Sequence, residues 1–207
     1  MGDRLRKDTL SDSDLKSLDD YRRSFDKAYE VVVRTIRERL QLEPTGRPAK
    51  STTSIIEKLH RESIRLSQMQ DIAGCRIVVK DINKQEEVVG ALREVFSKAS
   101  IVDRRKRPGC GYRAVHVIVN SAGKLVEIQV RSLLQHLWAQ FSERISDKVD
   151  PKIKYGGGKR EIQQNLQAVS RIVRDVEEKI NIPKQELNNI KKKLTEHFDK
   201  MIYGLKN

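Results

Sequence analysis

The chain has 207 residues, of which 37% are hydrophobic and 34% are charged, and its formal net charge at pH 7 is +13. This length allows one domain with a real core, and the charge favours polyanionic partners such as nucleotides, RNA or anionic lipid. No apolar run approaches the roughly 20 residues that span a bilayer, and no apolar signal segment begins the chain, so we expect a cytoplasmic protein without a membrane partner.

The first predicted element is an amphipathic helix. Apolar residues recur every three or four positions over 14–42, with Ser11 or Ser13 as possible N-caps. Two prolines and a glycine within 43–54 predict a loop. A short helix is expected to restart after Ser54.

Strands and helices alternate through the rest of the chain. The apolar patterns predict strands at 72–79, 112–120 and 125–131, with a hairpin turn around 121–123, and helices at 84–98, 133–145, 160–180 and 184–205. Helices beside a small mixed sheet indicate an α+β fold, and we expect the whole chain, 1–207, to form one domain. The two C-terminal helices are amphipathic, so they are candidates for a homo-oligomer or partner-docking surface.

Two carboxylates flank predicted strands. Asp71 precedes the strand IAGCRIVV, and Glu127 lies inside the strand VEIQVR. Neighbouring strands are about 4.8 Å apart, so these side chains can share a divalent cation such as Mg²⁺. In the alternative interpretation, Asp71 caps a turn and Glu127 is a solvated edge residue.

Basic and hydroxyl side chains recur in KSTTSIIEKLHR. Lys50, Ser54, Lys58 and Arg61 follow one another at intervals of four, four and three residues, which places them on one face of a helix. Such a row of donors suits a triphosphate, whose charge it would neutralise. A solvated charged helix face is the alternative.

A basic, glycine-containing segment lies at 103–116, DRRKRPGCGYRAVH. Gly109 and Gly111 permit close backbone approach, and the ring of Tyr112 offers a flat face for a nucleobase. His116 follows four residues later. An ordinary basic hairpin loop with a buried tyrosine would give the same pattern.

Together, these motifs resemble the synthetase domain of the RelA/SpoT family. The order KSxxSxxxKxxR, DIAGxR, GYRAVH and EIQVR matches over about 47–145. The resemblance implies a nucleotidyltransferase-like mixed sheet flanked by helices, and the helices predicted from periodicity at 14–42 and 160–205 would flank this catalytic core. It also implies an enzyme that moves the β,γ-pyrophosphate of ATP onto a ribose 3′-hydroxyl.

The resemblance assigns roles residue by residue. It implies that Asp71 and Glu127 bind Mg²⁺, with Glu127 also the base for the 3′-hydroxyl. The implied ATP-binding residues are Arg47, Lys50, Ser54, Lys58, Arg61 and Arg76, of which Arg76 and Arg47 would lie beside the adenine. The implied acceptor-binding residues are Tyr112, which would stack on the nucleobase, and His116, Gln129 and Arg131, which would contact the ribose or phosphates.

The chain also departs from the family pattern. Pro48 stands where an arginine is common, and the loop before Tyr112 reads DRRKRPGCGY in place of a form such as DYIxxPKxNGY. No His-Asp dipeptide is present, so the metal motif of the family's hydrolase half is missing. We therefore expect a synthetase without the hydrolase activity.

Two acceptors are compatible with this family. One group of small synthetases converts GDP or GTP to alarmones, and a toxic group modifies the 3′-terminal adenosine of tRNA. QHLWA and the YGGG break resemble the toxic group, and Arg104, Arg105 and Arg107 would bind tRNA. A neutralising antitoxin would then be a partner. The alternatives are an alarmone synthetase acting on GDP or GTP and a non-catalytic RNA-binding module.

Overall fold

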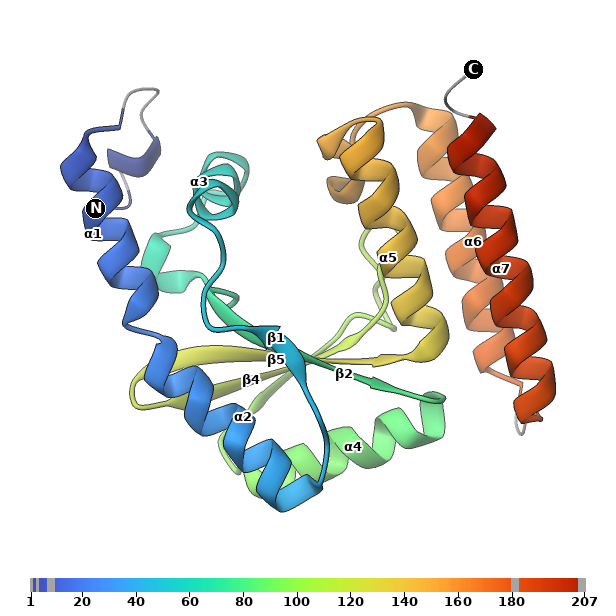
Figure 1. Ribbon diagram of the computed structural model, residues 1–207, viewed down its shortest axis with the longest axis horizontal. Coiled ribbons are helices and arrows are strands. Elements are labelled where there is room, and N and C mark those ends of the chain that lie inside the picture. The colour runs from blue at the N-terminus through green and yellow to red at the C-terminus, as the bar shows by residue number, and fades with distance from the viewer. Residues whose placement is uncertain (1, 3, 7–9, 180–182, 205–207) are drawn as a thin grey trace. The chain divides into compact units, whose positions relative to one another are not determined.

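The computed structural model describes residues 2, 4–6, 10–179 and 183–204. A five-stranded mixed sheet in the order β1-β2-β5-β4-β3 is flanked by helices, which confirms the predicted α+β class (Figure 1). The strands are β1 (Thr45–Arg47), β2 (Ala73–Val79), β3 (Ser100–Asp103), β4 (Val115–Ser121) and β5 (Lys124–Ser132). The longer helices are α1 (Asp12–Arg23), α2 (Asp26–Leu40), α3 (Thr52–Arg61), α4 (Ile82–Val95), α5 (Leu133–Lys148), α6 (Arg160–Glu177) and α7 (Lys184–Gly204).

The N-terminal segment forms two helices, so the single helix predicted over 14–42 was wrong. Ser11 caps α1, and its side chain accepts a hydrogen bond from the Asp14 backbone N–H at 3.2 Å. At the other end the Ser24 hydroxyl donates to the Tyr21 carbonyl at 2.6 Å, which competes with the helical backbone bonds. The apolar periodicity continues across this break, because Phe25 is buried at the junction.

The predicted loop at 43–54 contains a strand and a helix start. β1 pairs antiparallel with β2, in the register Thr45↔Arg76 and Arg47↔Gly74. Gly46 permits this approach, since a Cβ there would lie 2.4 Å from the Gly74 carbonyl oxygen. Helix α3 begins at Thr52, three residues before the predicted restart at Ile55, because Ser51 is its N-cap.

The hairpin between β4 and β5 confirms the turn predicted around 121–123. Ala122 and Gly123 form its two-residue loop and both have left-handed backbone angles, with φ of 51° and 76°. Two-residue loops of this hand match the twist of the strands that they join. The turn fixes the register of β5, which carries Glu127 and Gln129.

The described residues group into two compact units within the predicted single domain. The described residues of Met1–Ile77, Val88–Val102 and His116–Val130 form the first unit. Those of Val78–Glu87, Asp103–Val115 and Arg131–Asn207 form the second. In the first unit, α2 lies along one face of the sheet (Figure 1). Its buried side chains include Val32 and Ile36.

The second unit has its own apolar core between α5, α6 and α7. Trp138 and Phe141 of α5 are buried in it, together with Leu166 and Val173 of α6. The Phe141 ring stacks on that of Phe198 from α7, with centroids 3.7 Å apart. The predicted helical flank at 160–205 is therefore largely present, although Leu205 lies outside the described residues.

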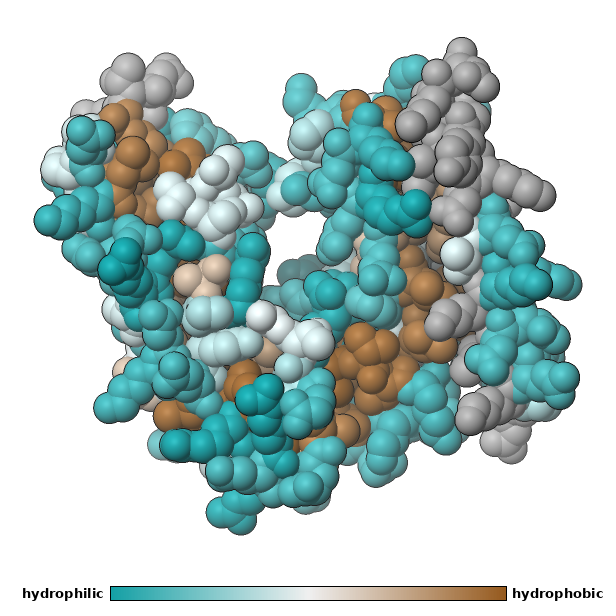
Figure 2. Space-filling view, viewed as in Figure 1, coloured by the Kyte–Doolittle hydropathy of each residue, from teal (hydrophilic) through white to brown (hydrophobic). Residues whose placement is uncertain are grey.

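The face drawn in Figure 2 is mainly polar, in keeping with the charged composition, and its apolar side chains gather in smaller groups. Among the described helices, none is long and apolar enough to cross a membrane.

Candidate active site

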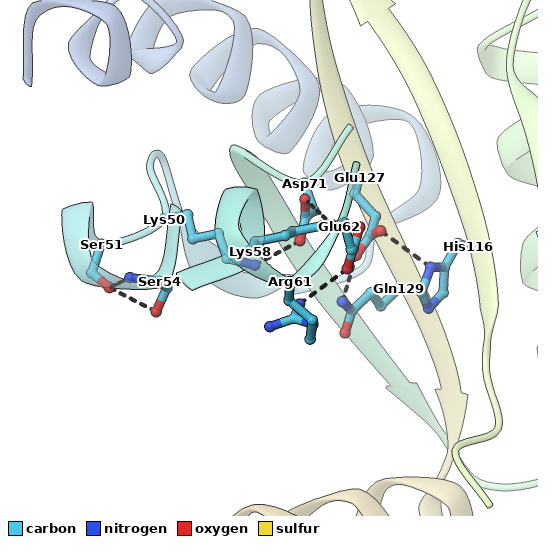
Figure 3. A network of polar contacts seen from close by, with 10 residues as sticks. All are labelled: Lys50, Ser51, Ser54, Lys58, Arg61, Glu62, Asp71, His116, Glu127 and Gln129. Atoms are coloured by element: carbon cyan, nitrogen blue, oxygen red, sulfur yellow. Dashed lines mark hydrogen bonds and ion pairs between the residues drawn. The ribbon is translucent and has the colours of Figure 1, made fainter. Parts of the chain in front are cut away.

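The lysine-rich segment at the start of α3 is held in place by backbone contacts. The Lys50 N–H donates to the Ile72 carbonyl at 2.6 Å, and Arg22 of α1 donates from Nε to the Lys50 carbonyl at 2.7 Å. Ser51 donates from its hydroxyl to that of Ser54 at 2.8 Å. Lys50 therefore precedes the helix instead of forming its first turn. Its side chain nevertheless reaches the same carboxylate, that of Asp71, as the side chain of Lys58 does (Figure 3).

Asp71 binds both of these lysines. Its Oδ2 lies 2.7 Å from Lys50 Nζ and its Oδ1 lies 2.7 Å from Lys58 Nζ. Burial acts to raise the pKa of Asp71, but the two ammonium groups outweigh it and hold the pKa below its ordinary value. Asp71 is therefore an ionised carboxylate at neutral pH, with a cation on each oxygen.

Glu127 is the buried acid of β5, with 8% of the residue exposed. His116 of β4 donates from Nδ1 to its Oε2 at 3.1 Å, and Gln129 donates from Nε2 to its Oε1 at 2.5 Å. Burial acts to raise the pKa of Glu127, but these hydrogen bonds outweigh it and hold the pKa below its ordinary value. The carboxylate is ionised and both of its oxygens are oriented.

Asp71 and Glu127 act on each other electrostatically. The charge of Asp71 works to raise the pKa of Glu127, and the two carboxylates lie near one another in Figure 3. The strands that carry them are neighbours, and a Cβ at Gly74 of β2 would lie 2.9 Å from the Glu127 carbonyl oxygen. Within the described part of the chain, no group of three or more His, Cys, Asp or Glu side chains could hold a metal. Asp71 and Glu127 are therefore considered as metal ligands only as a pair.

Glu62 joins the network and was not predicted from the sequence. It caps the C-terminus of α3, where its Oε1 lies 3.0 Å from Arg61 Nη2 and its Oε2 lies 4.0 Å from Lys58 Nζ. The signal in the sequence was that Glu62 directly follows Arg61, the last residue of the predicted phosphate-binding series. Arg22 was also missed, because it is distant in sequence from the segment that it holds.

Arg47 and Arg76 are brought close by the pairing of β1 with β2. Arg47 lies opposite Gly74, and Arg76 is two residues farther along the same strand. Alternation along β2 places Gly74 and Arg76 on one face, so the two arginines are diagonal neighbours on that face. Diagonal neighbours are within reach of side chains as long as arginine.

Tyr112 and Arg131 meet in the second unit. Arg131 donates from Nη2 to the Tyr112 hydroxyl at 3.1 Å, and its guanidinium lies 5.0 Å from the centre of the ring. The preceding residue, Gly111, has φ of 90°, and a Cβ there would lie 2.7 Å from the Trp138 ring. The Ser170 hydroxyl donates to the Gly111 carbonyl at 2.6 Å, so the core of this unit fixes the segment before Tyr112.

The three arginines after β3 have different surroundings. Arg105 binds Asp103 at 2.8 Å and Glu86 at 2.6 Å, and only 14% of its side chain is exposed. Arg104 and Arg107 are exposed. In this conformation, Arg105 holds the loop while its two neighbours face solvent.

A family model described as "Region found in RelA / SpoT proteins" matches residues 46–152. The uncharacterized protein Rv1366 of Mycobacterium tuberculosis is 38% identical over 111 residues, which cover 52% of this chain and 41% of that protein. The chain thus spans about two fifths of the length of this relative. GTP pyrophosphokinase YjbM of Bacillus subtilis is 33% identical over 157 residues, covering 65% of this chain and 69% of that protein.

Solved structures share the fold. Small alarmone synthetase 1 from Bacillus subtilis, bound to its product pppGpp, aligns with a TM-score of 0.58 at 23% identity, over 89% of this chain and all of that chain. The type VI effector Tas1, in complex with its immunity protein, aligns with a TM-score of 0.53 at 16% identity, over 81% of this chain and all of that chain.

Proposed function

Because this chain belongs to the RelA/SpoT family, we propose that it is a pyrophosphokinase that transfers the β,γ-pyrophosphate of ATP to a ribose 3′-hydroxyl. The observation that carries the proposal is the network of two ionised carboxylates, Asp71 and Glu127, beside the lysines of the first unit. An RNA-binding module without catalysis has no need of an oriented, buried carboxylate such as Glu127. The geometry therefore favours an enzyme.

ATP would bind through the cations of α3 and the segment before it. Lys50 and Lys58, which share Asp71 in the free protein, would move onto the triphosphate, and Ser54 and Arg61 would add a hydroxyl and a guanidinium. Cations placed on the transferring group stabilise charge that grows in the transition state. Arg47 and Arg76, on paired strands, would stack beside the adenine.

Asp71 and Glu127 suit Mg²⁺ as the metal. Both are ionised, both offer oxygen, and Mg²⁺ is commonly held by one or two carboxylates with phosphate oxygens and water completing the octahedron. When bound, the ion would neutralise negative charge on the phosphates. The transfer of lysines from Asp71 to ATP would free the carboxylate oxygens for this role.

Glu127 would take the proton from the attacking 3′-hydroxyl. His116 and Gln129 hold its two oxygens, so the carboxylate keeps one orientation while an acceptor binds. His116 and Gln129 would also contact the acceptor ribose or phosphates. Tyr112, braced by Arg131, would offer its ring to the acceptor base.

For the acceptor, we favour the 3′-terminal adenosine of tRNA, with inhibition of translation as the outcome. The net charge of +13 and the exposed Arg104 and Arg107 support an extended polyanion. Arg105 would support their loop through Asp103 and Glu86. Both tRNA and free nucleotides are cytoplasmic, so the proposed activity is a cytoplasmic one.

An alarmone synthetase acting on GDP or GTP is the second candidate. It is favoured by the similarity to GTP pyrophosphokinase YjbM, which covers about two thirds of each protein. This candidate uses the same ATP site and the same catalytic base, Glu127. It differs only in the acceptor, whose nucleobase would be the guanine of GDP or GTP at Tyr112.

If the chain is a toxin, a neutralising protein is an expected partner. The complex of Tas1 with its immunity protein supports this partner class. The amphipathic α6 and α7 are a candidate surface for such a partner or for a homo-oligomer.

An acceptor panel tests the proposal. Purified protein is incubated with ATP labelled in the γ-phosphate, together with deacylated tRNA, GDP or GTP, and the labelled products are separated. We expect label in tRNA above that in either nucleotide. The opposite preference would support the alarmone synthetase, and no transfer to any acceptor would overturn the pyrophosphokinase.

A further inference from the structure

The second unit contains a pocket of about 880 Å³ that shares no residue with the network of Figure 3. It is lined by the turn between β2 and α4, the loop after β3, the start of α5 and the end of α6. Small-molecule sites commonly have volumes of about 300–1,000 Å³. Among the described lining residues, four are acidic and six are basic, namely Lys80, Arg105, Lys106, Arg113, Arg174 and Lys179.

The two inner acids of the pocket already have donors. Asp103 accepts from Arg105 through both oxygens, at 2.9 and 2.8 Å. Glu177 accepts from the Ser132 hydroxyl and, at 3.1 Å, from Gln135 Nε2. Arg105 is the matching cation for Asp103, so this pair adds little net charge to the pocket.

Arg113, which also lines the pocket, has no carboxylate partner among the described residues of the kind that Arg105 has in Asp103. Its Nε is buried and has no hydrogen-bond partner, and no ion pair involves it among the residues that the structure describes. Glu177 and Glu178 act on it only at longer range. A buried donor without an acceptor destabilises the protein, so an anion that accepts from Arg113 would remove this cost.

Lys106 and Lys179 supply further positive charge at the rim. Both are exposed, both line the pocket, and neither forms an ion pair within the described ranges. Arginine and lysine side chains commonly bind phosphate in proteins. We propose that this pocket binds a small phosphorylated anion of up to nucleotide size through Arg113, Lys106 and Lys179.

A small molecule fits these observations better than an RNA backbone does. Arg113 is half-buried in the wall of a concave pocket, whereas the exposed Arg104 and Arg107, which do not line it, are open to a polymer. None of the described residues that line the pocket is aromatic. The phosphates, more than a stacked base, would therefore supply the affinity.

Nuclear magnetic resonance of arginine side chains tests the site directly. Inorganic pyrophosphate, GDP and a short RNA oligonucleotide are titrated in turn into ¹⁵N-labelled protein, and the Nε–H resonances of Arg113 and Arg104 are followed. We expect pyrophosphate to shift the Arg113 resonance saturably while that of Arg104 stays in place. A response to pyrophosphate alone would identify an inorganic polyphosphate, and a response to GDP as well would identify a nucleotide.

Variants separate this site from the proposed active site. Lys50→Ala/Lys58→Ala should leave the Arg113 response unchanged even if the pyrophosphokinase proposal fails. Arg113→Gln should weaken pyrophosphate binding in the second unit at least tenfold, and Arg104→Gln should not. Lys106→Ala/Lys179→Ala should weaken pyrophosphate binding as well. Because both residues are exposed, this loss could not be explained by misfolding, as a loss in the Arg113 variant could be.

Several results would overturn the inference. These are an Arg113 resonance that no phosphate probe moves, equal shifts at Arg104 and Arg113, loss of the response in Lys50→Ala/Lys58→Ala, or a response to the RNA oligonucleotide alone.

Discussion

Glu127 is ionised although it is buried, because His116 and Gln129 donate to its two oxygens. In Glu127→Gln the amide oxygen keeps one of these donors, and the amide NH₂, which is close in size to the oxygen that it replaces, faces the other. Glu127→Gln therefore removes the proton acceptor at small cost to the packing. General base catalysis typically contributes about 10²–10⁴-fold, so we expect transfer from ATP to fall by about that factor.

The measurement is the initial rate of transfer, with the melting temperature as a check on folding. Glu62→Gln is the matched control, since Glu62 belongs to the same network but has no proposed part in the chemistry. A Glu127→Gln rate near that of the native protein would remove the base role from Glu127.

Asp71 links stability to pH. Its folded-state pKa lies below the ordinary 3.8, so its contribution to stability is present above 3.8 and is lost as the pH falls through the folded value. Asp71→Asn should lower the free energy of unfolding by about 1–3 kcal/mol at neutral pH, because Lys50 and Lys58 lose their shared partner.

Melting curves between pH 7 and pH 2 test this expectation. The gap between the native protein and Asp71→Asn should close below pH 3.8, while Asp20→Asn, an exposed control, should differ little at any pH. A gap that stays constant with pH would show that the lysine contacts contribute nothing through charge.

Among the elements, β2 and β5 approach each other closely at Gly74. A Cβ at this position would lie 2.9 Å from the Glu127 carbonyl oxygen, so Gly74→Val forces the strands apart. Overpacking of this kind typically costs about 1–3 kcal/mol. We expect a lower melting temperature together with reduced transfer, because Glu127 moves with its strand.

Gly90→Ala is the control for this glycine. Gly90 lies within α4 and a Cβ there meets nothing within 4 Å, so the substitution should stabilise the helix by about 0.5–1 kcal/mol. Equal effects of the two changes would mean that the approach of β2 to β5 is not tight.

The loop after β3 is expected to bind RNA through its exposed arginines. Arg104→Glu/Arg107→Glu should weaken tRNA modification and flatten its dependence on salt, because each lost phosphate contact lowers the slope by about one. Transfer to GDP should be unaffected. Arg34→Glu/Arg39→Glu on α2 makes the same charge change at exposed positions and serves as the control.

Steady-state kinetics at several salt concentrations provide the measurement. If both double variants weaken tRNA modification equally, a general effect of net charge accounts for it and the loop has no special part.

Elements with strong periodicity could be predicted from the sequence, whereas short or exposed ones could not. The hairpin at Ala122–Gly123 and the amphipathic α6 were predicted, because turn residues and apolar spacing define them locally. β1 was missed, since its three residues, Thr45–Arg47, are all exposed and show no alternation. It forms only because Gly46 lets it pair with β2.

The site was partly predictable in the same sense. The motifs placed Lys50, Lys58 and Asp71 in one region, but their spacing could not show that both lysines bind the same carboxylate. Contacts between segments far apart in sequence, such as Arg22 with Lys50, depend on tertiary structure and leave no local pattern.

At the scale of the whole molecule, the chain passes repeatedly between the two units, and strands β2, β4 and β5 each contribute to both. We therefore expect a single cooperative unfolding transition. Trp138, the one tryptophan of the sequence, lies in the core of the second unit, so its fluorescence reports the unfolding of that unit.

A non-hydrolysable ATP analogue, which would bind the first unit, should raise the melting temperature seen by Trp138. At 100 times the dissociation constant the stabilisation is about 2.7 kcal/mol, which corresponds to roughly 5–10 °C for a chain of this size. Circular dichroism should give the same midpoint. An unmoved Trp138 transition, beside a shifted one in circular dichroism, would show that the units unfold independently.

The ion pairs of Lys50 and Lys58 with Asp71 also affect which anions can bind at these lysines. An anion that binds the two lysines has to displace the Asp71 carboxylate, so binding exchanges one negative group for another. A triphosphate can engage both lysines at once, so we expect it to compete with Asp71 more effectively than a single phosphate group, which carries a charge of only about −1.5 to −2. We therefore expect the resting protein to favour polyphosphates over monophosphates at the binding step, before any chemistry begins.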